Sequence, residues 1–123
     1  ALFKIFIPMR RYMWSGKTKF VESFLKELFT DRDEFAVKYL SKVFLHFNMD
    51  FTPVPTIDKE KAANIKTPIT LFAAKHDVLF PGEKMIKRAT QIFPSLKESK
   101  LFENSKHVQN KTQNKIIEEV ILS

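Results

Sequence analysis

Asp77 and His107 are the two residues whose types and positions fit a catalytic pair. Asp77 follows the apolar run 68–74, and His107 follows a second strand-like segment at 96–103. Functional groups collect at the carboxyl ends of strands in open α/β sheets, so parallel strands would bring both loops to one edge. A carboxylate that accepts from one imidazole nitrogen leaves the other free as a general base. These positions predict Asp77 as the acid and His107 as the base; a helix cap and a surface histidine are the alternative interpretation.

A metal site is another possible role for the histidines. The chain has no cysteine, which excludes a disulfide, a thiolate nucleophile and a cysteine-ligated metal. A site formed by His46, His76 and His107 would have none of the spacings typical of zinc motifs. We therefore predict no metal and no cofactor, with His46 as a packed or surface residue and His76 as a structural neighbour of Asp77.

Hydrophobic spacing predicts two amphipathic, unusually aromatic helices in the first half of the chain, over 18–29 and 33–47. The apolar face expected for the second consists of Phe35, Leu40, Val43, Phe44 and Phe47. The candidates for capping the first helix are Ser15 and Thr18, and those for the second are Asp31 and Asp33. Faces of this kind suit a lid over an apolar pocket as well as plain core packing.

The second half of the chain has the pattern of an α/β protein. The expected elements are a proline-containing linker at 51–58 that ends in the helix cap Asp58, a short helix at 59–65, a strand at 67–74, a helix at 82–93, a strand at 96–103 and a helix at 110–123. The first strand is almost wholly apolar, which is typical of strands buried on both faces of a parallel sheet. The order predicts the α/β class, with a helical segment at 1–57 and a strand-helix-strand-helix part at 58–123.

The net charge of +7 over 123 residues suggests nucleic acid or an acidic partner. Lysines and glutamates alternate at short intervals, however, and only Arg10-Arg11 and the pair Lys17 and Lys19 cluster. Interspersed charge is usually a solvated face, so we predict no nucleic-acid partner. A basic binding module for nucleic acid or an acidic partner is the alternative function from another class.

The opening of the chain does not resemble a secretory signal. The apolar opening precedes its basic residues, the reverse of a secretory signal, and no apolar run approaches the roughly 18 residues of a membrane span. We therefore expect a cytoplasmic protein with no membrane partner. The chain starts inside one apolar stretch and ends on another, so we also expect it to be part of a larger protein.

Two loop sequences resemble a known family. KHDVLFP (75–81), directly after TPITLFAA, resembles the acid loop of α/β-hydrolases, and FENSKHV (102–108) resembles their histidine loop. The resemblance covers about residues 58–123, and 3–51 fits the family's helical cap insertion in length and position. It implies the C-terminal portion of an α/β-hydrolase fold, carboxylesterase- or lipase-like, with Asp77 and His107 as triad members.

The sequence also departs from that family. Ala74 stands where the acid loop usually has glycine, and Asn104-Ser105-Lys106 replaces a turn of small residues. Gly16 and Gly82 are the only glycines, and neither borders a G-x-S-x-G elbow. The resemblance therefore implies that the nucleophilic serine lies outside this chain. We expect the chain by itself to be inactive.

The resemblance also implies partners. An apolar ester would be the substrate, and the N-terminal half of the same protein would complete the sheet. Without that half, apolar faces and a sheet edge would be uncovered, and a homo-oligomer is the alternative way to cover them. A dehalogenase or an epoxide hydrolase, with an aspartate nucleophile on the other half, fits the same residues.

Overall fold

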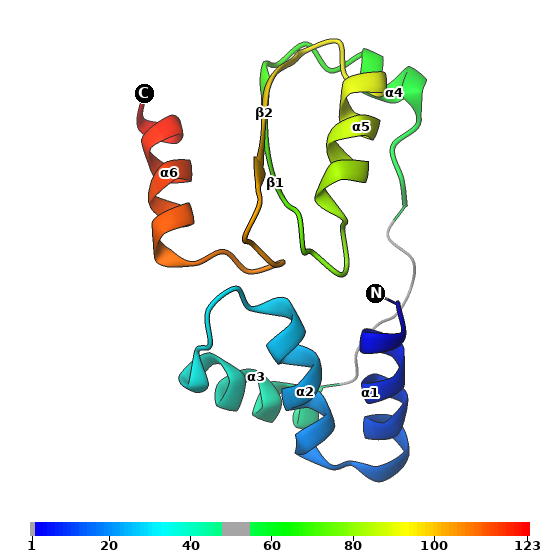
Figure 1. Cartoon of the computed structure of the whole chain (residues 1–123). Helices are drawn as coiled ribbons and strands as arrows, with labels where there is room; N and C mark the ends of the chain where they lie inside the picture. The colour runs from blue at the N-terminus through cyan, green and yellow to red at the C-terminus, as the bar shows by residue number, and fades with distance from the viewer. Residues whose placement is uncertain (1, 48–54) are drawn as a thin grey trace.

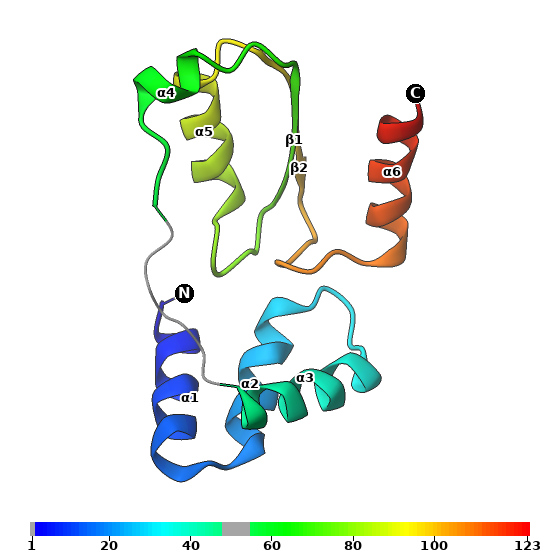
Figure 2. The same cartoon turned by 180° about the vertical axis from the view of Figure 1, so that it is seen from behind.

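The structure is a computed structural model that describes residues 2–47 and 55–123. Figures 1 and 2 show the helices of the N-terminal part together at one end of the molecule and a strand-containing part at the other. The elements in chain order are α1 (Leu2–Ser15), α2 (Thr18–Leu28), α3 (Glu34–His46), α4 (Lys59–Ala63), β1 (Ile69–Ala74), α5 (Gly82–Ile92), β2 (Leu96–Phe102) and α6 (Lys111–Leu122). Residues 51–54 of the predicted linker at 51–58 lie outside the described residues, and the division near residue 57 stays a prediction.

The sheet consists of β1 and β2, which pair in parallel with Ala74 opposite Phe102. Helix α5 connects the two strands and packs on one side of them, while α6 lies on the other side in both views (Figures 1 and 2). Parallel strands need a crossover connection of this kind because a tight turn cannot join them. The α/β prediction is therefore confirmed at the level of a small two-stranded parallel sheet with helices.

The prediction that the first strand is buried on both faces is wrong. In β1 only Ala73 and Ala74 are buried, and Thr70 is exposed. The sheet has two strands within the described residues, and α6 covers little of it, with Ile121 74% exposed. Strand β2 is more exposed than β1, as predicted.

The core of the helical part is formed by α2. The amphipathic helix predicted over 18–29 is confirmed, because Val21, Phe24, Leu25 and Leu28 on one face of α2 are all buried. Residues at i, i+3, i+4 and i+7 share one face of a helix, and this face is the one that α1 and α3 contact. Burial of each such side chain contributes roughly 1.5–3 kcal/mol relative to exposure.

The apolar face predicted for the second helix is partly wrong. Phe35 and Phe47 are 80% and 69% exposed, whereas Val37 and Ser41 are buried. The helix turns toward α2 the face that contains Val37, Ser41 and Phe44, and the Phe44 ring meets Phe24 edge to face at a centroid distance of 6.2 Å. The predicted face is therefore correct at Leu40 and Phe44, which pack against the core, and wrong at Phe35 and Phe47.

Helix α1 is absent from the elements that the sequence predicts. Pro8 lies inside it and cannot donate a backbone hydrogen bond, which makes a helix a poor expectation there. Packing stabilises it nonetheless, because Met9 is buried against the helical core and Tyr12 donates its hydroxyl hydrogen to the carbonyl of Phe44 at 2.8 Å. Across the described ranges, no helix has the length and apolar character needed to cross a membrane.

Of the five residues predicted as helix caps, Asp33 and Asp58 are confirmed, and Ser15, Thr18 and Asp31 are not. Asp33 Oδ1 accepts from the Ala36 amide at 2.9 Å, and Asp58 Oδ1 accepts from the Lys61 amide at 2.7 Å. Helix α2 instead begins after Lys17 with no side-chain cap, so neither Ser15 nor Thr18 caps it. The Ser15 hydroxyl donates to the carbonyl of Arg11 within α1.

The Asp33 cap gives a first test of the fold. Asp33→Ala should lower the free energy of unfolding by about 1 kcal/mol, because the Ala36 amide loses its acceptor. Asp31→Ala is the matched control, with an expected change within about 0.5 kcal/mol. Urea unfolding followed by circular dichroism measures both, and equal effects would show that the cap does not stabilise α3.

Candidate acid–base site

The loops after β1 and β2 lie side by side, joined by backbone hydrogen bonds. The Lys75 amide donates to the Phe102 carbonyl at 3.1 Å, and the His76 amide donates to the Ser105 carbonyl at 2.9 Å. These bonds continue the parallel pairing past the strand ends. The loop that carries Asp77 is thereby fixed against the loop that carries His107.

Asp77 has both carboxylate oxygens engaged. Its Oδ1 accepts from the backbone amides of Leu79 and Phe80, each at 2.8 Å, as in a turn closed by an aspartate side chain. Its Oδ2 lies 2.9 Å from Nδ1 of His107. The side chain is only 9% exposed. The two amides therefore hold the carboxylate in the orientation that presents Oδ2 to the imidazole.

His107 is paired on one ring nitrogen and open on the other. An ionised carboxylate only accepts, so the contact with Asp77 places the hydrogen of the neutral imidazole on Nδ1 and the lone pair on Nε2. Within residues 2–47 and 55–123, Nε2 has no hydrogen-bond partner, and the side chain is 34% exposed. The Phe80 ring lies 5.8 Å from the imidazole, centroid to centroid.

The predicted juxtaposition of Asp77 and His107 is thus confirmed by geometry, and their catalytic role stays a prediction. The arrangement can deprotonate a hydroxyl or water at Nε2 and hold the resulting imidazolium against the carboxylate. The alternative interpretation of Asp77 as a helix cap is wrong, because the amides that it binds belong to its own loop and α5 begins after Pro81 without a side-chain cap.

An open cleft of about 540 Å³ adjoins Asp77. It is lined by the acid loop, by Glu27 of α2 and by Lys106 of the histidine loop, with Val78 and Pro81 as its apolar contributors. Lys75, also on its edge, hydrogen-bonds to Glu103 at 2.5 Å, and this contact raises the pKa of the lysine above its ordinary value. Lys75 is therefore a cation at neutral pH and no rival to His107 as a base.

The other two histidines, His46 and His76, take no part in the contact between Asp77 and His107. His46 is exposed on α3, and His76 is exposed with its backbone amide bonded to Ser105. In the described ranges, no three side chains of His, Asp or Glu converge in a way that could hold a metal ion.

Neither glycine belongs to a nucleophile elbow. Gly16, with φ of 61°, follows a helix and has open space around it. Gly82 begins α5 and lies against the backbone of Ala74. An elbow needs a strand before the turn and a helix after it, so Ser15-Gly16 does not form one.

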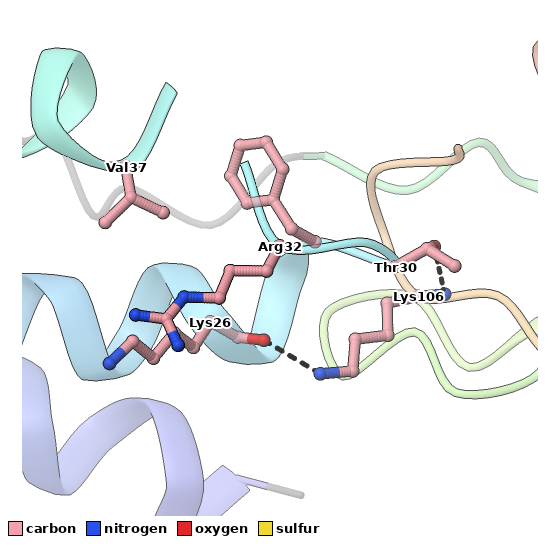
Figure 3. Close-up of a pocket in the computed structure, with 6 residues that line it drawn as sticks. Lys26, Thr30, Arg32, Val37 and Lys106 are labelled. Carbon is pink, nitrogen blue, oxygen red and sulfur yellow. Dashed lines mark hydrogen bonds between the residues drawn. The ribbon is translucent and has the colours of Figure 1, made fainter. Parts of the chain in front are cut away.

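A second, smaller hollow of about 210 Å³ lies where α2 meets the histidine loop, lined in part by Lys26, Arg32 and Lys106 (Figure 3). Two of these cations already have partners. Arg32 pairs with Glu34, and the Lys106 ammonium donates to the Lys26 carbonyl at 2.8 Å. Only the Arg32 pair offsets a charge, because the carbonyl that Lys106 contacts is neutral. Binding of nucleic acid or an acidic partner stays an untested alternative.

Comparison with protein-family models, with curated proteins and with solved structures finds no match to this chain.

Proposed function

We propose that this chain supplies the acid and the base of a serine hydrolase of the α/β-hydrolase type, most simply a cytoplasmic carboxylesterase acting on an apolar ester. The observation that carries the proposal is the 2.9 Å contact between Asp77 Oδ2 and His107 Nδ1, with Nε2 left open. The two loop sequences, at 75–81 and 102–108, support it independently. Residues 58–123 would form the C-terminal part of the hydrolase core, and residues 1–57 its helical cap.

In this mechanism His107 is the proton carrier. Its Nε2 takes the hydroxyl proton of a serine as the serine oxygen attacks the ester carbonyl, and Asp77 stabilises the imidazolium that forms. The imidazolium then protonates the departing alkoxide, which leaves as an alcohol. In the second half-reaction Nε2 takes a proton from water as the water attacks the acyl-enzyme. The imidazolium then returns that proton to the serine oxygen as the bond to the acyl group breaks and the acid is released. The burial of Asp77 strengthens its interaction with the imidazolium, because little water screens it.

The serine in this proposal belongs to a segment other than residues 1–123. Of the serines near the pair, Ser105 is fully buried and its hydroxyl is hydrogen-bonded within the histidine loop and to α6. The segment that carries the serine would be an N-terminal half of the same protein. Exposed apolar side chains on α1, namely Phe3, Phe6, Met13 and Trp14, offer a surface for that half or for a second copy. A dehalogenase or epoxide hydrolase would differ in having an aspartate nucleophile there.

Active-site labelling tests the proposal. A fluorophosphonate probe should label the complete polypeptide that contains residues 1–123, on a serine in a G-x-S-x-G sequence, and that polypeptide should hydrolyse p-nitrophenyl butyrate. Residues 1–123 alone should be neither labelled nor active. Labelling of a serine within residues 1–123 would contradict the assignment of the nucleophile, and an inert complete polypeptide would remove the proposal.

A further inference from the structure

The Thr30 hydroxyl makes hydrogen bonds to both residues that flank His107. It accepts from the Lys106 amide at 2.9 Å (Figure 3) and donates to the Val108 carbonyl at 2.7 Å. A hydroxyl has one hydrogen to donate and lone pairs to accept with, so one side chain satisfies both backbone groups. Thr30 therefore spans His107 from the residue before it to the residue after it.

The backbone around Thr30 holds the same loop. The Thr30 amide donates to the Val108 carbonyl at 3.0 Å, and the Val108 amide donates to the Leu28 carbonyl at 2.8 Å. Phe29 and Val108 form a parallel bridge through these bonds. The Lys106 ammonium adds a bond to the Lys26 carbonyl at the end of α2 (Figure 3). The segment after α2 thus pairs with the histidine loop as a short strand would.

Ser105 extends this network to α6. It is fully buried, and its Oγ lies 3.3 Å from Oγ of Thr30 and 3.1 Å from Oε1 of Gln113. Gln113 in turn forms a capping box with Asn110 at the start of α6. Buried polar groups that are fully hydrogen-bonded define one arrangement, because each broken bond would leave an unsatisfied group. The residues on both sides of His107 are fixed in this way.

We propose that Thr30 is a positioning residue for His107, through which the helical segment sets the orientation of the base. The inference rests on the proposed function for its catalytic consequence only. The carboxylate of Asp77 is fixed from its own side, by the amides of Leu79 and Phe80. The 2.9 Å contact between acid and base therefore depends on two anchors, one inside the acid loop and one contributed by the segment after α2.

Two substitutions at Thr30 separate its hydroxyl from its shape. Thr30→Val keeps the size of the side chain and removes its hydrogen bonds to Lys106 and Val108 and its contact with Ser105, whereas Thr30→Ser keeps the hydroxyl. The first readout is the low-field NMR signal of the His107 Nδ1 hydrogen in residues 1–123, which reports the contact with Asp77. We expect this signal in the unsubstituted chain and in Thr30→Ser, and its loss by exchange with water in Thr30→Val.

The second readout is ester hydrolysis by the complete polypeptide. Thr30→Val should lower kcat by about 10- to 100-fold with KM changed less than about twofold, because a misplaced base impairs the chemical step more than binding. Thr30→Ser should retain kcat within about threefold. The control is Thr90→Val, which removes another exposed threonine hydroxyl bond, to the Ile86 carbonyl in α5. It should leave both readouts unchanged.

The outcomes decide the two proposals separately. Loss of the Nδ1 signal in Thr30→Val supports the positioning role even if the complete polypeptide hydrolyses no ester, in which case only the proposed function fails. An unchanged signal in folded Thr30→Val overturns the positioning role. If Thr30→Val does not fold, the result for Thr30→Ser tests the positioning role instead. Loss of the Nδ1 signal in folded Thr30→Ser overturns the positioning role, and retention of both the signal and kcat supports it.

Discussion

Replacing His107 with alanine is expected to lower kcat for ester hydrolysis by the complete polypeptide by about four to six orders of magnitude. The imidazole Nε2 is the group that would deprotonate the serine and later the water, so its removal eliminates both proton transfers. KM should change much less than kcat, because the imidazole acts in the chemical step. Steady-state kinetics with p-nitrophenyl butyrate measures both parameters.

Asp77→Asn separates the role of the acid from that of the base. An asparagine amide in place of Oδ2 would donate to Nδ1 and force the hydrogen of the neutral ring onto Nε2, which then cannot accept a proton. We expect a loss of about 10⁴-fold in kcat, and no further loss when the substitution is added to His107→Ala, since the two residues act as a unit.

His76→Ala is the matched control for both substitutions. The residue adjoins Asp77 and is exposed, but its contact with the histidine loop is made by its backbone amide, which alanine retains. We expect kcat within about threefold of that of the unsubstituted polypeptide, with any effect confined to KM, because His76 is among the residues that line the cleft beside Asp77. A His107→Ala polypeptide with more than a tenth of the original kcat would show that His107 is not the base.

The elements that could be predicted are those whose signal is local. An apolar run, a proline-glycine loop, an amphipathic segment and a second strand-like run follow one another between residues 67 and 103. A helix between two strands is the usual connection of a parallel pair, and β1 and β2 pair in parallel. Helix α1 has no such signal because Pro8 opposes a helix and Met9 reveals its role only when packed against α2. The buried face of α3 likewise depends on its neighbour: Phe35 fits a helical stripe in sequence, but contact with α2 selects Val37 and Phe44.

The same distinction applies to the site. Asp77 and His107 could be predicted because each directly follows a strand, so pairing of β1 with β2 brings them together. Thr30 could not, because its partners Lys106 and Val108 lie 76 and 78 residues away and nothing adjacent to Thr30 distinguishes it from an ordinary helix terminator. Phe80, which lies beside the imidazole, is visible in the sequence only as one aromatic residue among thirteen phenylalanines.

Gly82→Ala is expected to destabilise the fold more than Gly16→Ala does. A Cβ at Gly82 would lie 2.6 Å from the Ala74 carbonyl oxygen and 2.8 Å from Leu101 Cδ1. The backbone of Ala74 cannot move aside cheaply, because it is the end of β1 and is paired with Phe102. Overpacking of this kind costs about 1–3 kcal/mol. It should outweigh the gain of at most about 1 kcal/mol that alanine brings to a helix.

Gly16→Ala is the comparison for Gly82→Ala, because the added methyl group at Gly16 changes the preferred backbone conformation without contacting any neighbouring atom. Gly16 has φ of 61°, and no atom lies within 4 Å of the position that a Cβ would occupy there, so alanine should cost about 1 kcal/mol through the left-handed conformation alone. Asparagine tolerates that conformation, so Gly16→Asn should recover most of the loss, whereas Gly82→Asn should be worse than Gly82→Ala. Urea unfolding of the five proteins ranks them.

The consequence of Gly82→Ala should reach the acid–base pair. Ala74 and Gly82 are the two ends of the loop that carries Asp77, and their close approach sets the width of that loop. Pushing them apart by a few tenths of an ångström shifts Asp77, whereas His107 is held independently by Thr30. The low-field Nδ1 signal of His107 should therefore weaken in folded Gly82→Ala and persist in Gly16→Ala at matched stability. Equal signals in the two would mean that the width of the acid loop does not control the contact between Asp77 and His107.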